Sequence, residues 1–255
     1  MYTLKQAFGL AGKTAVITGG GTGLGFAIAG CMAAAGARVI LLGRREEVLK
    51  NACESIGENA SWRRFDLMCM EEIPMLADSI IGQAGNVDIL VNNAGIQYKK
   101  PAEEMTVEEY REVLDVHLTG SFALTKAFLP HMRARKKGSV IFLASMCSFM
   151  GNPYLTGYAS AKAGVLGLTR TFAGEASCDG VRFNAIAPGW IETPMFERAL
   201  GKDPKRRERI LERTPMKRFG IPEDIGWAAV YLASDASSFV TGASLVADGG
   251  ALIGL

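Results

Sequence analysis

Short runs of apolar, often β-branched residues alternate along this chain with longer segments rich in Ala, Leu, Glu and Lys. The short runs predict strands, and the longer segments have the length and periodicity of helices. We expect strands at residues 14–18, 38–42, 61–65, 88–92, 139–144, 181–186 and 244–247. We expect helices at residues 23–35, 46–56, 71–84, 107–134, 156–177 and 222–233.

This alternation predicts an α/β fold in which a parallel sheet carries helices on both faces. Residues 15–17 and 89–91 are apolar at successive positions, which is typical of strands buried on both sides. Because no linker or repeat divides the chain, we expect one domain over residues 1–255. Residues 193–216 hold three prolines and a dense charge cluster, and we expect this insertion to form a substrate lid.

Composition argues against several classes of function. The net charge of +2 is small and dispersed, so we expect no nucleic-acid or membrane partner. The five cysteines are scattered and form no Cys-x-x-Cys pair, so we expect reduced thiols in a cytoplasmic protein and no metal site. The first 13 residues lack a long apolar core, so we expect no signal peptide.

A glycine-rich turn, Thr18–Gly25, connects the first expected strand to the first expected helix. Its spacing is Gly-x-x-x-Gly-x-Gly, with Leu24 between the last two glycines. Glycine permits close approach to the backbone, and the N–H groups and dipole at a helix start can hold a pyrophosphate. The turn therefore predicts a dinucleotide site, with a plain tight connection as the alternative.

The second expected strand ends in Gly43-Arg44-Arg45, where dinucleotide folds place an acid for the ribose or a base for its 2′-phosphate. Two guanidinium groups suit a phosphate. The sequence therefore favours NADP over NAD, although the start of a solvated helix is the alternative.

Tyr158 and Lys162 lie four residues apart in an expected helix, so both side chains occupy one face. A phenol has a pKa of about 10, and a nearby ammonium together with a nicotinamide cation would lower it, so that Tyr158 exchanges protons with an alcohol. Ser145 ends an apolar strand, where side chains face the ligand crevice of α/β sheets. By itself, Tyr-x-x-x-Lys is also compatible with an ordinary helix.

Seven motifs in order resemble the short-chain dehydrogenase/reductase family. They are Thr18–Gly25, Asp66-Leu67, Asn92–Gly95, Ser145, Tyr158-x-x-x-Lys162, Pro188-Gly189-x-x-x-Thr193 and Val246–Gly250. The resemblance implies a Rossmann-type, doubly wound sheet of about seven strands. It also implies oxidoreduction of a CH–OH group with a nicotinamide cofactor, in a homotetramer or homodimer.

The resemblance also implies where NADP is bound. Lys162 would hold the nicotinamide ribose as well as lower the pKa of Tyr158, and Arg44 stands where NADP-preferring members carry a base. The remaining implied cofactor residues are Gly19, Gly21, Thr22, Gly23, Leu24, Gly25, Asp66, Leu67, Asn93, Ala94, Gly95, Tyr158, Pro188, Gly189, Ile191 and Thr193.

His117 is a departure from the family pattern, which usually has Asn at this position of the fourth helix. There the Asn helps to hold a water in the proton relay behind the lysine. An imidazole can bind a water and can also charge near neutral pH. We therefore count His117 with Ser145, Tyr158 and Lys162 as a catalytic candidate, and a catalytically impaired, nucleotide-sensing protein is the alternative.

The substrate signals are weaker. Met146, Cys147, Ser148, Asn152, Tyr154, Trp190 and Met195 are expected around a mixed pocket. Basic residues at 99–100 and 202–209 would suit an anionic substrate such as a sugar acid, or form a solvated face. Short segments also resemble the matching segments of family members that act in hexonate metabolism, which favours a keto-gluconate as substrate. A β-ketoacyl or general keto reductase is the alternative function.

Overall fold

The computed structural model describes residues 3–194, 196–197 and 203–254. Seven parallel strands form one sheet in the order β3-β2-β1-β4-β5-β6-β7. The seven expected strands are confirmed, with boundaries shifted by at most two residues. They are β1 (Thr14–Thr18), β2 (Arg38–Gly43), β3 (Ala60–Arg64), β4 (Ile89–Asn92), β5 (Gly138–Leu143), β6 (Val181–Pro188) and β7 (Ser244–Ala247).

The helices follow the expected pattern with three differences. The expected helix at 107–134 is interrupted by a π-helical turn at Asp115–Thr119. A short N-terminal helix forms because Thr3 and Gln6 make a capping box, and another helix lies within the expected lid. The helices are α1 (Leu4–Phe8), α2 (Gly23–Ala34), α3 (Glu46–Ile56), α4 (Ile73–Ala84), α5 (Val107–Leu114), α6 (Gly120–Ala134), α7 (Thr156–Ala176), α9 (Pro204–Arg213) and α10 (Pro222–Ala233).

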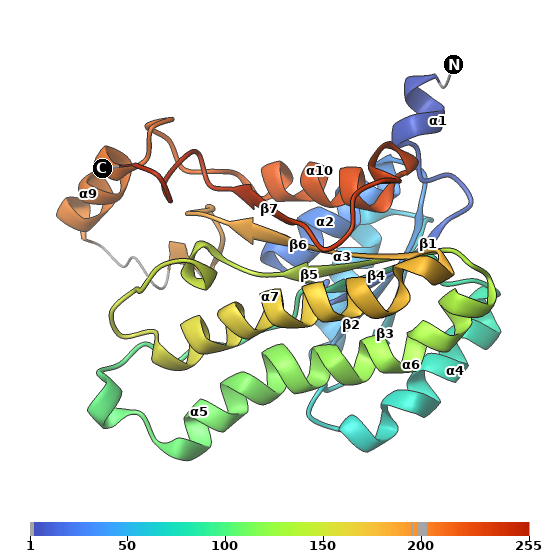
Figure 1. Cartoon of the computed structure of the whole chain (residues 1–255), viewed down its shortest axis with the longest axis horizontal. Helices are drawn as coiled ribbons and strands as arrows, with labels where there is room; N and C mark the ends of the chain where they lie inside the picture. Colours follow the sequence, from blue (N-terminus) through green and yellow to red (C-terminus); the bar gives the residue numbers. More distant parts are fainter. Residues whose placement is uncertain (1–2, 195, 198–202, 255) are drawn as a thin grey trace.

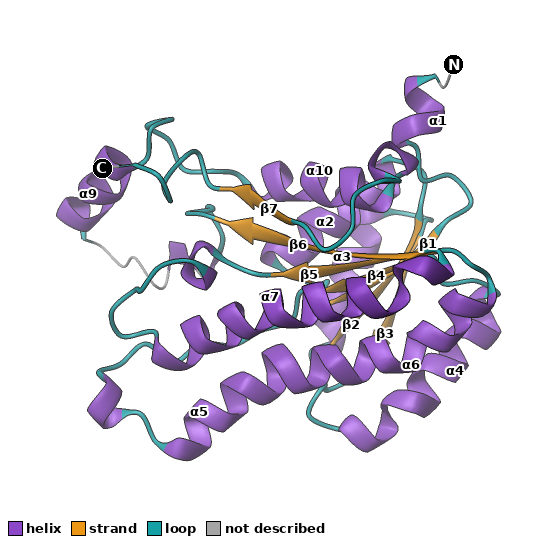
Figure 2. Ribbon diagram, viewed as in Figure 1, coloured by secondary structure: helices purple, strands orange, loops and turns teal. Residues whose placement is uncertain are grey.

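The sheet lies between two layers of helices, as Figures 1 and 2 show. Successive side chains of a strand point to opposite faces. Accordingly, Ala15 and Ile17 of β1 belong to the core formed with α2, α3 and α10, whereas Val16 belongs to the core with α4, α6 and α7. The expected parallel sheet, buried on both faces, is confirmed.

The strand order reverses direction at β1, because β2 and β3 continue on one side of it and β4 to β7 on the other. In open α/β sheets, ligands bind beyond the carboxyl ends of the strands at such a point. The last described residues lie beside α9, since Arg213 of that helix donates a hydrogen bond to the Ala251 carbonyl at 3.3 Å. The fold therefore predicts a site between the ends of β1, β4, β5 and β6.

Candidate active site

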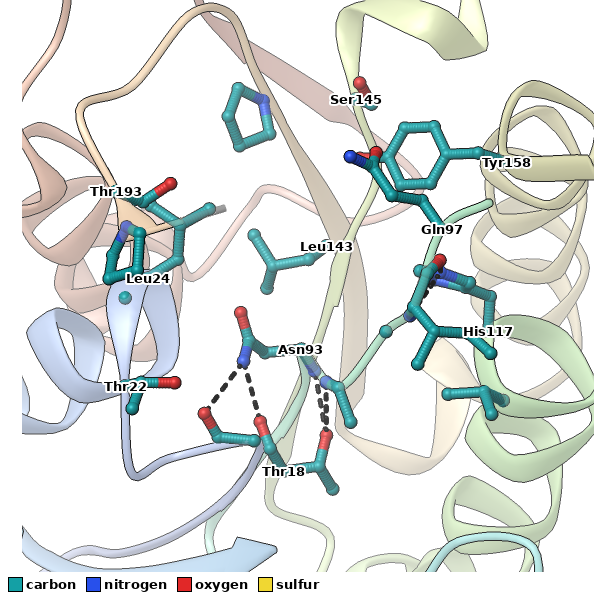
Figure 3. A pocket seen from close by; sticks show the side chains of 18 of the residues that line it. Thr18, Thr22, Leu24, Asn93, Gln97, His117, Leu143, Ser145, Tyr158 and Thr193 are labelled. Carbon is teal, nitrogen blue, oxygen red and sulfur yellow. Dashed lines mark hydrogen bonds between the residues drawn. The ribbon is translucent and has the colours of Figure 1, made fainter. Parts of the chain in front are cut away.

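A cleft of about 420 Å³ lies at this edge of the sheet. Figure 3 shows Thr22, Leu24 and Thr193 on one side of it, and Ser145 and Tyr158 on the other. Every cofactor and catalytic candidate from the sequence except Gly25 lines it: Gly19, Gly21, Thr22, Gly23, Leu24, Arg44, Asp66, Leu67, Asn93, Ala94, Gly95, His117, Ser145, Tyr158, Lys162, Pro188, Gly189, Ile191 and Thr193. Tertiary folding thus brings residues from six of the seven motifs, together with Arg44 and His117, to one cavity.

The glycine turn forms one end of the cleft. Gly19 and Gly23 have φ angles of +63° and +56°, values that residues other than glycine rarely adopt. Gly25 does not line the cleft; its role differs from the expected ligand contact, because a Cβ there would lie 2.3 Å from the Gly19 carbonyl oxygen. Gly25 therefore allows α2 to pack against the turn.

This turn has the chemistry of an anion cradle. Thr22 is the N-cap of α2 but its side chain makes no capping hydrogen bond, and the first turn of α2 has no acidic residue. Uncapped N–H groups and the positive end of the helix dipole favour a bound phosphate. The Thr18 hydroxyl accepts hydrogen bonds from the backbone N–H groups of Asn93 and Ala94, both at 2.9 Å, which ties the turn to the end of β4.

Two arginines follow β2 and line the same end of the cleft. The side chain of Arg44 is 62 % exposed and lies 3.9 Å from the Asp66 carboxylate. Asp66 also accepts a hydrogen bond from the Met68 N–H at 3.1 Å, so it caps the chain after β3 as well as bordering the cleft. Position 44, directly after β2, holds a base and not an acid, so this end of the cleft fits a ribose phosphate.

Ser145, Tyr158 and Lys162 meet on the opposite wall. Ser145 follows β5, and its hydroxyl accepts a hydrogen bond from the Cys147 N–H at 3.1 Å. Lys162 of α7 is buried, and its Nζ donates to the Leu143 carbonyl of β5. Ser148 joins the two elements, because its hydroxyl donates to the backbone carbonyl of Lys162 at 2.7 Å.

Burial dominates the ionisation of this pair. It raises the pKa of Tyr158 to about 12, and a hydrogen bond with Ser145 acts in the opposite direction. It also lowers the pKa of Lys162 to about 7. For the protein groups by themselves, burial therefore holds the pKa of Tyr158 above its usual value, and the expected lowering by Lys162 together with a nicotinamide cation stays a prediction.

His117 lies in the π-helical turn between α5 and α6 and borders the cleft beside Tyr158. Its side chain is buried and contacts the backbone of Ile96. Burial, and secondly the charge of Lys162, lower the pKa of His117 to about 3. The expectation that this histidine charges near neutral pH is therefore wrong: its imidazole is neutral there.

The far side of the cleft is mixed in character. Of the expected pocket residues, Met146, Cys147, Asn152 and Trp190 line it, whereas Ser148 and Tyr154 do not, and Met195 lies outside the described residues. Sequence reasoning did not assign Gln97, Leu155 or Phe196, which also line it. Gln97 was detectable only by its place two residues after the Asn-Asn-Ala-Gly turn.

The basic residues expected at the approach divide into two groups. Lys99 and Arg206 line the cleft, and burial together with the charge of Arg206 lowers the pKa of Lys99. Lys100 and Arg207 do not line it; Lys100 pairs with Glu109 at 2.7 Å, and Arg207 pairs with Glu192 at 3.0 Å. The basic sequence therefore reaches the cleft only in part.

Other site classes find no support in the part of the chain that the structure describes. Within these residues, no three His, Cys, Asp or Glu side chains gather as a metal site requires. Among the described helices, none combines the length and apolarity needed to span a bilayer.

Comparisons with known proteins agree with this geometry. A family model described as Enoyl-(Acyl carrier protein) reductase matches residues 19–251. The 2-dehydro-3-deoxy-D-gluconate 5-dehydrogenase of Bacillus subtilis is 40 % identical over 98 % of each chain. The 3-oxoacyl-(acyl-carrier-protein) reductase of Thermotoga maritima is 37 % identical over 96 % of this chain and 99 % of its own.

A solved structure extends the comparison. A gluconate 5-dehydrogenase from Burkholderia cenocepacia, in complex with NADP and tartrate, superposes with a TM-score of 0.93 at 33 % identity, covering 99 % of this chain and 100 % of its own. Sequence and fold thus agree over almost the whole length. The chain belongs to the short-chain dehydrogenase/reductase family, whose dehydrogenases act on CH–OH groups.

Proposed function

We propose that this protein transfers a hydride between NADP(H) and a secondary alcohol or ketone, with a sugar acid such as a keto-gluconate as substrate. The observation that carries the proposal is the single cleft in which Ser145, Tyr158 and Lys162 face the glycine turn of α2. Hydride transfer with a nicotinamide cofactor requires a site that binds the cofactor phosphates and a group that exchanges the substrate proton, and this cavity contains residues suited to both.

In the proposed mechanism, Ser145 binds the substrate oxygen and Tyr158 exchanges the proton. A bound nicotinamide ring would accept or supply the hydride. In reduction, the phenol gives its proton to the forming alkoxide, and in oxidation the tyrosinate takes the proton of the alcohol. With the cofactor bound, Lys162 would hold the nicotinamide ribose and stabilise the tyrosinate form, and its hydrogen bond to the Leu143 carbonyl fixes it beside Tyr158.

The cofactor assignment extends along the cleft. Gly19 to Leu24 would hold the pyrophosphate, Arg44 the 2′-phosphate, and Asp66 with Leu67 the adenine. Asn93 to Gly95 would border the ribose, and Pro188 to Thr193 the nicotinamide half. The NADP complex of the related gluconate 5-dehydrogenase supports this choice over NAD.

An anionic, hydroxylated substrate is supported by the far side of the cleft. Lys99 and Arg206 bring two positive charges to it from distant segments, which favours a carboxylate. Gln97 and Asn152 offer amide groups to hydroxyls. Relatives named for gluconate derivatives support the same substrate class, and the keto reductase from Thermotoga maritima supports a β-ketoacyl reductase as the second candidate.

We also propose that residues 193–216 act as a lid and that the protein is a cytoplasmic homotetramer or homodimer. Phe196 and Arg206 belong to this segment and line the cleft.

The proposed assembly is supported by exposed apolar side chains. They lie on α6, α10 and the chain end, with Phe122 exposed to 43 %, Trp227 to 53 % and Ile253 to 83 %. Light scattering of the purified protein measures the assembly.

A turnover assay tests the function. Purified enzyme is assayed with NADP(H) and NAD(H) against gluconate, keto-gluconates, a neutral polyol and a β-ketoacyl thioester. We expect turnover of the sugar acids with NADP(H), and a loss of about 10²–10⁴-fold in kcat for Tyr158→Phe with cofactor binding retained. Preference for the thioester would favour the β-ketoacyl reductase, and NADP binding without any turnover would favour the nucleotide-sensing protein.

A further inference from the structure

His117 connects two walls of the cleft that are distant in sequence. Its Nε2 lies 2.8 Å from the Ile96 carbonyl oxygen, in the turn that follows β4. Its ring meets the ring of Tyr158 edge to face, with centroids 5.5 Å apart and planes at 86°. The π-helical turn at Asp115–Thr119 sets the ring in this place, and such turns often occur at functional sites.

The contact with Ile96 selects one tautomer of the imidazole. Nε2 is also 3.2 Å from the Ile96 N–H, but a single nitrogen cannot both donate to the carbonyl and accept from the amide. The 2.8 Å approach to the oxygen is the shorter and is typical of an N–H donor. Nε2 therefore carries the proton, because a lone pair at this distance would repel the carbonyl oxygen.

The other ring nitrogen then becomes an acceptor. No described residue hydrogen-bonds Nδ1. The neighbouring charge is that of Lys162, which disfavours a second N–H and favours a lone pair. A neutral ring with a proton on Nε2 satisfies both neighbours, whereas an imidazolium would place two buried cations side by side.

We propose that His117 is a positioning residue that works as a neutral imidazole: Nε2–H holds the Ile96 carbonyl while the ring supports Tyr158 from the side. The proposal rests on the proposed function only for its kinetic consequence. Ile96 lies between Gly95 and Gln97, which line the cleft, so His117 fixes the distance between this turn and the tyrosine. Its loss should displace the Tyr158 hydroxyl and lower kcat more than it raises KM.

The first test needs no substrate. The chain contains two histidines, so a spectrum of the protein with ¹⁵N-labelled histidine reports on His117 and His131 alone, and His131→Gln assigns them. We expect His117 to keep the shifts of a neutral, Nε2-protonated ring from pH 8 to pH 5. An imidazolium in that range, or a proton on Nδ1, would overturn the proposal even if the substrate were misassigned.

The second test separates positioning from proton transfer. We expect His117→Ala to lower kcat at least about tenfold with substrate KM within about twofold of wild type, as misplaced groups do. His117→Asn should restore part of kcat, because its amide can donate to the Ile96 carbonyl, and it should keep the wild-type pH profile. His131→Ala, in α6, is the matched control and should retain wild-type kcat.

Two kinetic results would refute positioning by His117. One is wild-type kcat in a folded His117→Ala enzyme, with folding checked by NADP binding and thermal melting. The other is the disappearance, in His117→Asn, of an ionisation that the wild-type pH profile contains. Absence of turnover in the wild type would instead refute the proposed function and leave the spectroscopic test decisive.

Discussion

Substituting Gly95 with alanine should destabilise the protein through His117 rather than through the backbone. The φ angle of Gly95 is not among the positive values, so alanine is compatible with the backbone conformation. The added Cβ, however, would lie 2.1 Å from Cε1 of His117, and 2.8 Å and 2.9 Å from its two nitrogens.

The magnitude follows from these distances. Carbon atoms in contact are about 3.5–4.0 Å apart, so the ring must move by more than about 1 Å. The ring is buried, held by Ile96 and packed against Tyr158, so it has no free direction. Overpacking costs about 1–3 kcal/mol, and loss of the buried hydrogen bond adds about 1 kcal/mol. We expect the free energy of unfolding to fall by about 2–4 kcal/mol.

Urea denaturation followed by circular dichroism, at one fixed protein concentration, measures this loss. Gly82→Ala in α4 is the matched control, since no neighbouring heavy atom lies within 4 Å of its added Cβ. Its free energy of unfolding should rise by up to about 1 kcal/mol. In a His117→Ala background, Gly95→Ala should lose most of its cost. Wild-type stability of Gly95→Ala, or an equal cost in both backgrounds, would refute the steric argument.

Three further predictions concern charged residues. Arg44→Ala should raise the KM for NADP at least about tenfold and leave that for NAD nearly unchanged, which initial rates measure. Lys99→Met should raise the KM for sugar acids but not for a neutral polyol, whereas Lys100→Met, which removes a partner of Glu109 outside the cleft, should change neither. The pKa of Lys162 is about 7 when folded against an ordinary 10.5. The unfolded chain therefore binds more protons between pH 7 and 10, so this group makes stability rise with pH there, and Lys162→Met should flatten that rise in thermal melts.

Most of the fold was predictable because its signals are local. The apolar runs that became β1, β4 and β5 mark buried strands by themselves, and strand boundaries shifted by at most two residues. The π-helical turn at Asp115–Thr119 was not predictable, because residues 107–134 carry one continuous helical pattern. The extra residue in that turn is accommodated by packing against the rest of the protein, and such packing leaves no signal in the neighbouring sequence.

In the candidate site, too, local features were predictable and contacts between distant segments were not. The glycine turn and the four-residue spacing of Tyr158 and Lys162 were evident in the sequence, because a helix start and a helix face are set by neighbouring residues. Lys99 and Lys100 look alike in the sequence. Only the fold separates them, because Glu109 pairs with Lys100 while Lys99 lines the cleft.

By itself, the sequence determined the candidates for the chemistry, which are the glycine turn, Arg44, Ser145, Tyr158 and Lys162. The tertiary structure decided their state. Burial raises the pKa of Tyr158, lowers that of Lys162 and keeps His117 neutral, and each shift reverses or refines what the sequence suggested. The physical reason is that spacing along a helix is encoded within a few residues, whereas desolvation sums over side chains from several distant segments.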